Sequence, residues 1–352
     1  MDSLKVFELY SGIGGMHFAL KETGLNANII GAVDINPTAN SVYKLNFPDT
    51  NLLERNVQGL NEDYFNKLQV DMIMMSPPCQ PFTRNGLRKD LEDHRNISIL
   101  HVINLIPKLK TVKYILLENV LGFECSNVRN ELINSLRKSS FIYQEFLLSP
   151  DQFSIPNSRL RYYLLAKREP SQFCFSTMND IMLELPELRS DIFKKINSMN
   201  LKYKELAKDQ VCFKVGLIVS ETGGDIIEDN ILGKYGFLLD IATAESLRTC
   251  CFTKAYGRYV EGTGSVFTPE SSECVRDVYK KLEEFEKGSK DYIDLIKLLK
   301  LRYFSPEEVS CLMTFPQCFK FPSYFSNRQK YKLLGNSINV HVVAILTVIL
   351  VS

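Results

Sequence analysis

The chain has 352 residues, of which 45% are hydrophobic and 24% are charged, so it has an ordinary globular composition, long enough for one large domain with an appendage or for two domains. The formal net charge of +1 excludes a global field that would draw the protein to nucleic acid or membrane, so any polyanion site must be a local patch. Nine cysteines without a CxxC pair argue against a disulfide framework and a zinc cluster, and we predict no metal site.

The first 170 residues alternate apolar strands with amphipathic segments. We predict helices between the strands, one of them beginning at Pro37, and strands at 4–10, 27–34, 70–76, 114–120, 142–149 and 159–167. This alternation predicts an α/β fold, a doubly wound and mostly parallel Rossmann-like sheet with helices on both faces.

After Pro170 this rhythm is lost, and residues 171–325 give weaker, mixed signals. Within them, Ser305, Pro306 and Glu308 have the spacing of a helix N-terminus with a capping box. We interpret the apolar segment 338–351 as a buried terminal helix that returns to the first domain, because it is short for a membrane span. The predicted domains are therefore 1–170 plus 326–352, and 171–325.

The N-terminus has no charged region followed by an apolar one, which argues against a secretory signal. Free thiols are typical of a reducing compartment. We therefore expect a cytoplasmic monomer with no membrane association, and nuclear residence stays open.

A glycine turn follows the first strand in ELYSGIGGMHFAL. Gly12, Gly14 and Gly15 would let a ligand approach the backbone at a helix N-terminus. Asp34 ends the next strand, where a doubly wound fold places a carboxylate for ribose hydroxyls. His17 replaces the third glycine of the dinucleotide fingerprint, which favours a nucleoside cofactor without a pyrophosphate, such as S-adenosylmethionine. The alternative is a tight turn that binds no ligand.

Polar side chains follow two further strands. Cys79 comes directly after Pro77 and Pro78 in SPPCQPFTRNG, and Glu118 ends the strand in LLENV. The prolines stiffen the loop and keep the thiol out of a helix. Both residues are expected at the carboxyl edge of the sheet, where open α/β folds bind ligands. Glu118 could alternatively be a solvated carboxylate at a strand end.

Two arginines alternate in SRLRYYLLAK. If this segment is a strand, Arg159 and Arg161 share a face and form a charge-stabilising site; the alternative is a surface cation pair. A thiol, an acid, two arginines and S-adenosylmethionine suit methylation of a pyrimidine at carbon 5. The thiolate would add to carbon 6, the acid would donate to ring nitrogen 3, and the base would be flipped into the pocket.

These motifs, together with LLGNSINVHVVA near the C-terminus, resemble those of the cytosine-5 methyltransferases. Their order along the chain also matches that family over nearly the whole length. Within that family, PPCQPFTRNG, CFTKAYGRYVEGTGS and LRYFSPEEVSCLMTFP resemble the small eukaryotic subgroup of tRNA-aspartate cytosine-38 methyltransferases. The resemblance implies Cys79 as the nucleophile, Glu118 as the acid, and an anticodon-loop cytosine of tRNA-Asp as the substrate. It also implies a target-recognition domain at 171–325 and a terminal helix packed on the glycine turn. The further cofactor contacts implied are Tyr10, Ile13, Ile35, Asn56, Val57, Ser76, Pro78, Asn336 and Ser337.

Four cations are candidate substrate-binding residues. Arg84 and Arg88 follow Cys79, and Lys254 and Arg258 interleave with the aromatic residues of CFTKAYGRY, a pattern suited to an unstacked loop. Solvated surface cations would give the same pattern. The adjacent Cys250 and Cys251 lack metal-ligand spacing and stay outside the predicted catalytic set. A DNA substrate with the same mechanism and, as a further alternative, a non-catalytic nucleic-acid-binding protein stay open.

Overall fold

The computed structural model describes residues 3–78, 96–220 and 223–352. Its main sheet has seven strands in the order β3-β2-β1-β4-β5-β7-β6. The strands are β1 Leu4–Leu9, β2 Ala27–Val33, β3 Leu52–Leu53, β4 Met72–Met75, β5 Tyr114–Val120, β6 Phe141–Leu148 and β7 Arg161–Arg168. Neighbours from β3 to β5 pair in parallel, whereas β7 is antiparallel to both β5 and β6. The predicted α/β class and mostly parallel sheet are confirmed.

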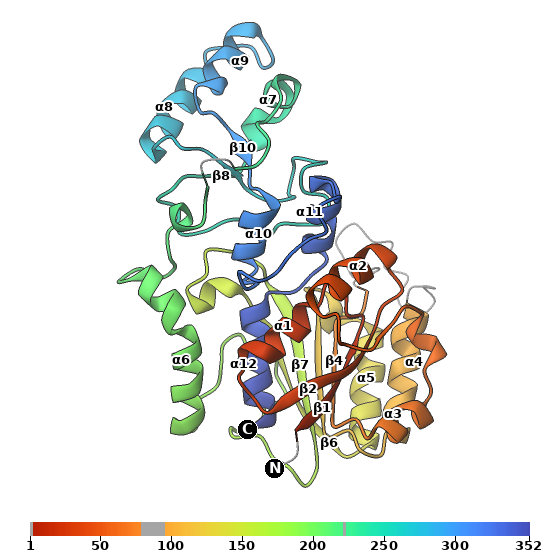
Figure 1. The fold of residues 1–352 in the computed structure, drawn as a ribbon. Helices are drawn as coiled ribbons and strands as arrows, with labels where there is room; N and C mark the ends of the chain where they lie inside the picture. The colour runs from red at the N-terminus through yellow and green to blue at the C-terminus, as the bar shows by residue number, and fades with distance from the viewer. Residues whose placement is uncertain (1–2, 79–95, 221–222) are drawn as a thin grey trace.

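Helices cover both faces of this sheet (Figure 1). One face carries α1 Gly15–Glu22, α2 Pro37–Asn46 and α12 Val340–Val351; the other carries α3 Glu62–Leu68, α4 Ile97–Leu105 and α5 Asn127–Lys138. Alternate residues of one strand enter different cores: Met72 and Met74 pack on the first face, and Ile73 and Met75 on the second. Burial on both faces explains why the central strands are apolar without interruption.

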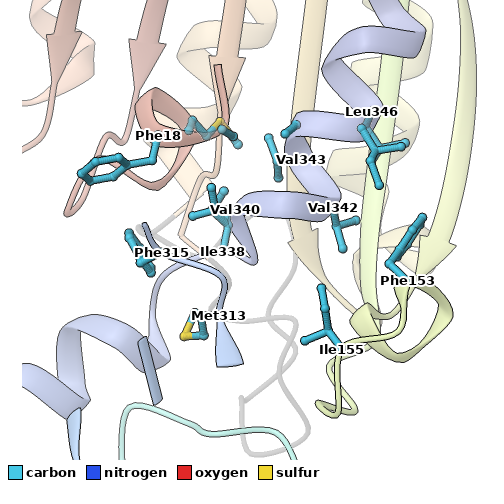
Figure 2. Close-up of a cluster of buried hydrophobic side chains, with 14 of the residues drawn as sticks. Phe18, Phe153, Ile155, Met313, Phe315, Ile338, Val340, Val342, Val343 and Leu346 are labelled. Carbon is cyan, nitrogen blue, oxygen red and sulfur yellow. The ribbon is translucent and has the colours of Figure 1, made fainter. Parts of the chain in front are cut away.

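Helix α12 lies in the middle of the larger core. Every residue from Val340 to Leu350 is buried, as expected for a helix that is apolar on all sides. Figure 2 shows Phe18 of α1 beside Val340 and Ile338, with Phe153 and Ile155 on the opposite side of α12. The predicted packing of the terminal helix against the glycine-turn helix is thereby confirmed.

The same region is the one described segment long and apolar enough to cross a membrane, by length and composition alone. This segment, Asn327–Val351, has 78% of its most apolar window buried inside the protein. It comprises α11, Asn327–Gly335, and α12. Burial at this level is what the core helix of a folded domain shows.

Part of the segment 171–325 forms a second, smaller body at one end of the molecule (Figure 1). It has a three-stranded sheet and a core of its own. Its elements are β8 Ile241–Ala242, β9 Val266–Phe267, β10 Arg302–Tyr303, α7 Asp229–Tyr235, α8 Ser272–Leu282 and α9 Lys290–Lys297.

Two other helices of that segment contribute to the large core instead. Helix α6, Ser190–Ala207, packs against α12, and Val309 and Leu312 of α10, Pro306–Leu312, join the large core. Helix α10 begins with the predicted capping box between Ser305 and Glu308. The division at 170/171 and 325/326 stays a prediction.

Candidate active site

The glycine turn lies between β1 and α1 and forms part of the wall of a cavity of about 510 Å³. Gly12 and Gly14 have φ of +52° and +84°, values that L-residues rarely adopt. A Cβ on Gly15 would lie 2.7 Å from Ile338, so only glycine allows the segment before α12 to approach this closely. The turn therefore exposes backbone to the cavity while α12 supports it from behind.

Asp34 stands opposite this turn, directly after β2. Its carboxylate accepts hydrogen bonds from the backbone N–H groups of Gly12 and Asn36, both at 2.8 Å. Burial raises the pKa of this carboxyl, although these N–H donors oppose the shift. Asp34 thus ties the glycine turn to the end of β2, and it also lines the cavity.

The predicted cofactor residues converge on this cavity. All of them line it except Gly14, which faces Phe47 instead: Tyr10, Gly12, Ile13, Gly15, Asp34, Ile35, Asn56, Val57, Ser76, Pro78, Asn336 and Ser337. They come from the ends of β1, β2 and β4, from the segment after β3 and from the loop before α12. Parallel strands that end at one edge explain why segments so far apart in sequence meet here.

Glu8 also lines the cavity, and the sequence reasoning missed it. It is 1% exposed, accepts a hydrogen bond of 2.9 Å from the hydroxyl of Tyr43, and has its pKa raised to about 8 by burial. The hydroxyl of Tyr43 also contacts Nδ1 of His17 at 2.9 Å. The sequence could have indicated Glu8, because it is an acidic residue inside an otherwise apolar strand.

Glu118 lies near the end of β5, at the same edge of the sheet. The hydroxyl of Ser76 donates to its Oε2 at 2.6 Å, and Nε of Arg161 lies 3.6 Å from its Oε1. Arg161 reaches this edge because β7 is antiparallel to β5, so that the first residue of β7 pairs with Val120. In a parallel strand, the start of β7 would lie at the opposite edge.

Arg159 differs from the prediction that it shares a strand face with Arg161. The strand predicted at 159–167 begins at Arg161, and Arg159 lies in the preceding segment. Its guanidinium donates to the carbonyl oxygens of Phe252, Gly335 and Ser337. It therefore ties together two loops that are distant in sequence, and burial lowers its pKa.

Both arginines meet at the thiol of Cys251, which the sequence analysis kept outside the catalytic set. Its Sγ lies 3.4 Å from Nη1 of Arg159 and 3.6 Å from Nη2 of Arg161. Burial raises the pKa of this thiol, but the two guanidinium groups outweigh burial and hold the pKa below its usual value. The neighbouring thiol of Cys250 has its pKa raised by burial.

The remaining predicted residues divide into two groups. Cys79, Arg84 and Arg88 lie outside the described residues. Lys254 lines the cavity, and Arg258 lies over the ring of Tyr259 at 5.0 Å.

The aromatic residues of this loop are not equally accessible. Tyr259 is 56% exposed and free to stack on a base, but Phe252 and Tyr256 are each only 2% exposed. Of the aromatic residues predicted to suit an unstacked loop, Phe252 and Tyr256 are therefore buried and cannot stack on a base in this structure. The described residues contain no cluster of three or more His, Cys, Asp or Glu side chains that could hold a metal ion.

Comparisons with known proteins identify the family and support the fold. A model of the family "C-5 cytosine-specific DNA methylase" matches residues 4–350. A Spodoptera frugiperda protein named tRNA (cytosine(38)-C(5))-methyltransferase is 46% identical over 99% of each chain. A human protein of the same name is 41% identical over 99% of this chain and 100% of its own. The crystal structure of a Spodoptera frugiperda DNMT2 mutant superposes with a TM-score of 0.87 at 45% identity, covering 99% of this chain and 100% of that one.

Proposed function

Because the chain belongs to the C-5 cytosine-specific DNA methylase family, we propose that it methylates carbon 5 of cytosine 38 in tRNA-Asp, with S-adenosylmethionine as donor. One observation supports the chemistry above all others. A buried carboxyl group, Glu118, faces Arg161 at the edge of the sheet, in the same cavity as a glycine turn and a carboxylate suited to a nucleoside.

The residues of the cavity fit S-adenosylmethionine. The bare backbone at Gly12 leaves room for a ligand, and the carboxylate of Asp34 retains lone pairs that can accept from ribose hydroxyls. Asn336 and Ser337 add polar groups to the lining of the same cavity. When bound, S-adenosylmethionine supplies an electrophilic methyl group.

This chain's own residues would then activate the cytosine. The Cys79 thiolate adds to carbon 6 and makes carbon 5 nucleophilic. Glu118, oriented by Ser76, donates a proton to ring nitrogen 3, which makes the addition favourable. Arg161 stabilises the charge that develops beside Glu118. Once carbon 5 carries the methyl group, loss of its proton to a base re-forms the double bond between carbons 5 and 6 and expels Cys79 as a thiolate.

An unstacked RNA loop suits the entrance of the cavity. Lys254 lines the cavity, and the exposed Tyr259 with Arg258 over its ring offers a base-stacking surface beside a cation. We assign target recognition to the segment 171–325, which supplies this loop. The relatives named as cytosine-38 methyltransferases support tRNA, whereas the family description names DNA, so duplex DNA is the second candidate substrate.

Tritiated S-adenosylmethionine, incubated with the protein and either total tRNA or duplex DNA, tests the proposal. We expect label in tRNA and a single cytosine of the tRNA-Asp anticodon loop protected in bisulfite sequencing. Label in DNA alone would keep the mechanism and overturn the substrate, and label in neither would contradict the activity.

The nucleophile is tested by Cys79→Ala. We expect this variant to lose methylation while its tRNA affinity stays within about threefold, because the thiol forms the covalent bond but contributes little to binding the RNA. Filter binding and the tritium assay measure the two quantities. Retained turnover in this variant would exclude the covalent mechanism.

A further inference from the structure

We propose that Cys251 is a positioning residue that acts as the anionic counter-ion of Arg159 and Arg161 and thereby leaves Glu118 able to hold a proton during catalysis. This inference rests on the proposed function, because it concerns how the acid of that reaction is maintained. In this role Cys251 acts through the two arginines and not by contact with the cytosine or the methyl donor.

The contacts place the thiol between two cations. Nη1 of Arg159 and Nη2 of Arg161 both point at Sγ of Cys251, at 3.4 and 3.6 Å. Oε1 of Glu118 lies 3.6 Å from Nε of Arg161. The phenol of Tyr163 is buried beside this group, and burial raises its pKa, so it stays neutral. In the described part of the chain, Glu118 is the one carboxylate that forms an ion pair with either arginine.

The balance of charge explains why a second anion matters. With a neutral Cys251, two buried guanidinium groups would face one carboxylate, and a proton on Glu118 would leave both cations uncompensated. Burying unpaired charge is costly, so Glu118 would be held in its ionised form. A Cys251 thiolate keeps one anion beside the arginines, and Glu118 can then carry the proton that it donates to ring nitrogen 3.

The loop that carries Cys251 is held firmly enough for this role. Arg159 donates to the carbonyl oxygen of Phe252 at 3.1 Å, and a Cβ on Gly335 would lie 2.1 Å from the backbone nitrogen of Lys254. The loop is therefore packed directly against the segment before α12. In this role no bond to Cys251 forms or breaks; the proton moves between Glu118 and ring nitrogen 3 as the Cys79 thiol adds and leaves.

The neighbouring cysteine provides a matched control. The backbone N–H of Cys250 donates to the hydroxyl of Ser265 at 2.7 Å, and the charged groups that influence its thiol are Asp240 and, more weakly, Arg248, rather than Arg159 or Arg161. Cys250→Ser changes the same atom in the same loop without changing the charge beside the arginines.

The test is the pH dependence of kcat for tRNA methylation in Cys251→Ser, Cys251→Asp and Cys250→Ser. Cys251→Ser keeps the shape but not the charge, so we expect the alkaline limb of its profile to move about one pH unit toward acid. Cys251→Asp restores an anion, so the alkaline limb of its profile should lie at the same pH as in the unmodified protein. The same is expected for Cys250→Ser. An unshifted profile for Cys251→Ser, or equal shifts for Ser and a folded Asp variant, would overturn the proposal.

A second measurement does not depend on turnover. Thiolates absorb near 240 nm, so Cys79→Ser can be titrated with and without the additional change Cys251→Ser. We expect the difference spectrum to show a thiolate already present at pH 7. A difference that appears only above pH 9 would overturn the proposal even if Cys251→Asp does not fold. A thiolate in this titration, together with no tRNA methylation by the unmodified protein, would instead count against the proposed function.

Discussion

The cavity has two halves that are built in different ways. In the cofactor half, β1, the glycine turn, β2 and Asp34 lie within a stretch of about 35 residues, and the bond from Gly12 to Asp34 spans 22 positions. In the target half, the contact from Arg161 to Cys251 spans 90 positions, and that from Arg159 to Ser337 spans 178. The glycine turn and Asp34 of the cofactor half form a local motif, to which Ser76, Asn336 and Ser337 are added from distant segments. The target half contains no such local unit, because the contacts of both its arginines join distant segments.

The two halves also bury their acids differently. Among the described residues, no arginine forms an ion pair with Glu8 of the cofactor half; burial raises the pKa of this carboxyl, and Tyr43 donates to it. Glu118 of the target half faces Arg161 and, beyond it, Cys251. Desolvation therefore dominates the surroundings of the Glu8 carboxyl, whereas charged neighbours dominate the surroundings of Glu118.

The largest expected effect comes from Glu118→Gln in the target half. Glutamine keeps the shape and can still accept from Ser76, but it cannot transfer a proton. We expect kcat for tRNA methylation to fall about 10²- to 10⁴-fold, while the affinity for S-adenosylmethionine changes less than about threefold. Single-turnover kinetics and calorimetry measure the two quantities.

Glu124→Gln is the matched control for this change. Glu124 lies six positions further along, accepts from the backbone N–H of Gly122 at 2.7 Å and does not line the cavity. We expect its activity to stay within about twofold of the unmodified protein. Equal losses in the two variants would show that the target half does not depend on the Glu118 proton.

The difference between the halves also determines what sequence could predict. The glycine turn, Asp34 and the sheet were predicted from local patterns, because each depends on spacing within one strand–turn–helix unit. The antiparallel direction of β7 was not predicted, because local apolar alternation carries no information about strand direction. For the same reason, the separate positions of Arg159 and Arg161, and the thiol of Cys251 between them, emerged only from the long-range contacts.

A smaller effect is expected from Asp34→Asn in the cofactor half. Both carboxylate oxygens accept from backbone N–H groups, and an amide would turn a donor toward one of them. We expect the dissociation constant for S-adenosylmethionine to rise about 10- to 100-fold, because hydrogen bonds to a charged group contribute about 1.5–3 kcal/mol. The value of kcat at saturating cofactor should stay within about threefold.

Calorimetry and saturation kinetics test this separation. Glu54→Gln is the control, since Glu54 pairs with Lys44 at the surface and does not line the cavity. A large loss of kcat in Asp34→Asn at saturating cofactor would contradict the functional separation of the two halves.

The smallest expected effect is on stability and concerns Glu8→Gln. Burial raises the pKa of Glu8 from 4.5 to about 8, so its carboxyl stays protonated in the folded protein where the unfolded chain has already ionised it. Its contribution to stability is complete below pH 4.5 and is lost as the pH rises toward 8, by at most about 1.4 kcal/mol per pH unit. Glutamine cannot ionise, so the variant should lack this slope.

Urea unfolding of both proteins at pH 5.5 and 7.5 measures the slope. His17, whose pKa burial lowers to about 3, destabilises the folded protein as the pH falls below about 6.5, but both proteins contain it, so its contribution is largely removed from the difference. We expect the unmodified protein to lose more stability than Glu8→Gln between these two pH values. Parallel pH dependences would mean that Glu8 is ionised in the folded state, and the contrast between the two buried acids would no longer hold.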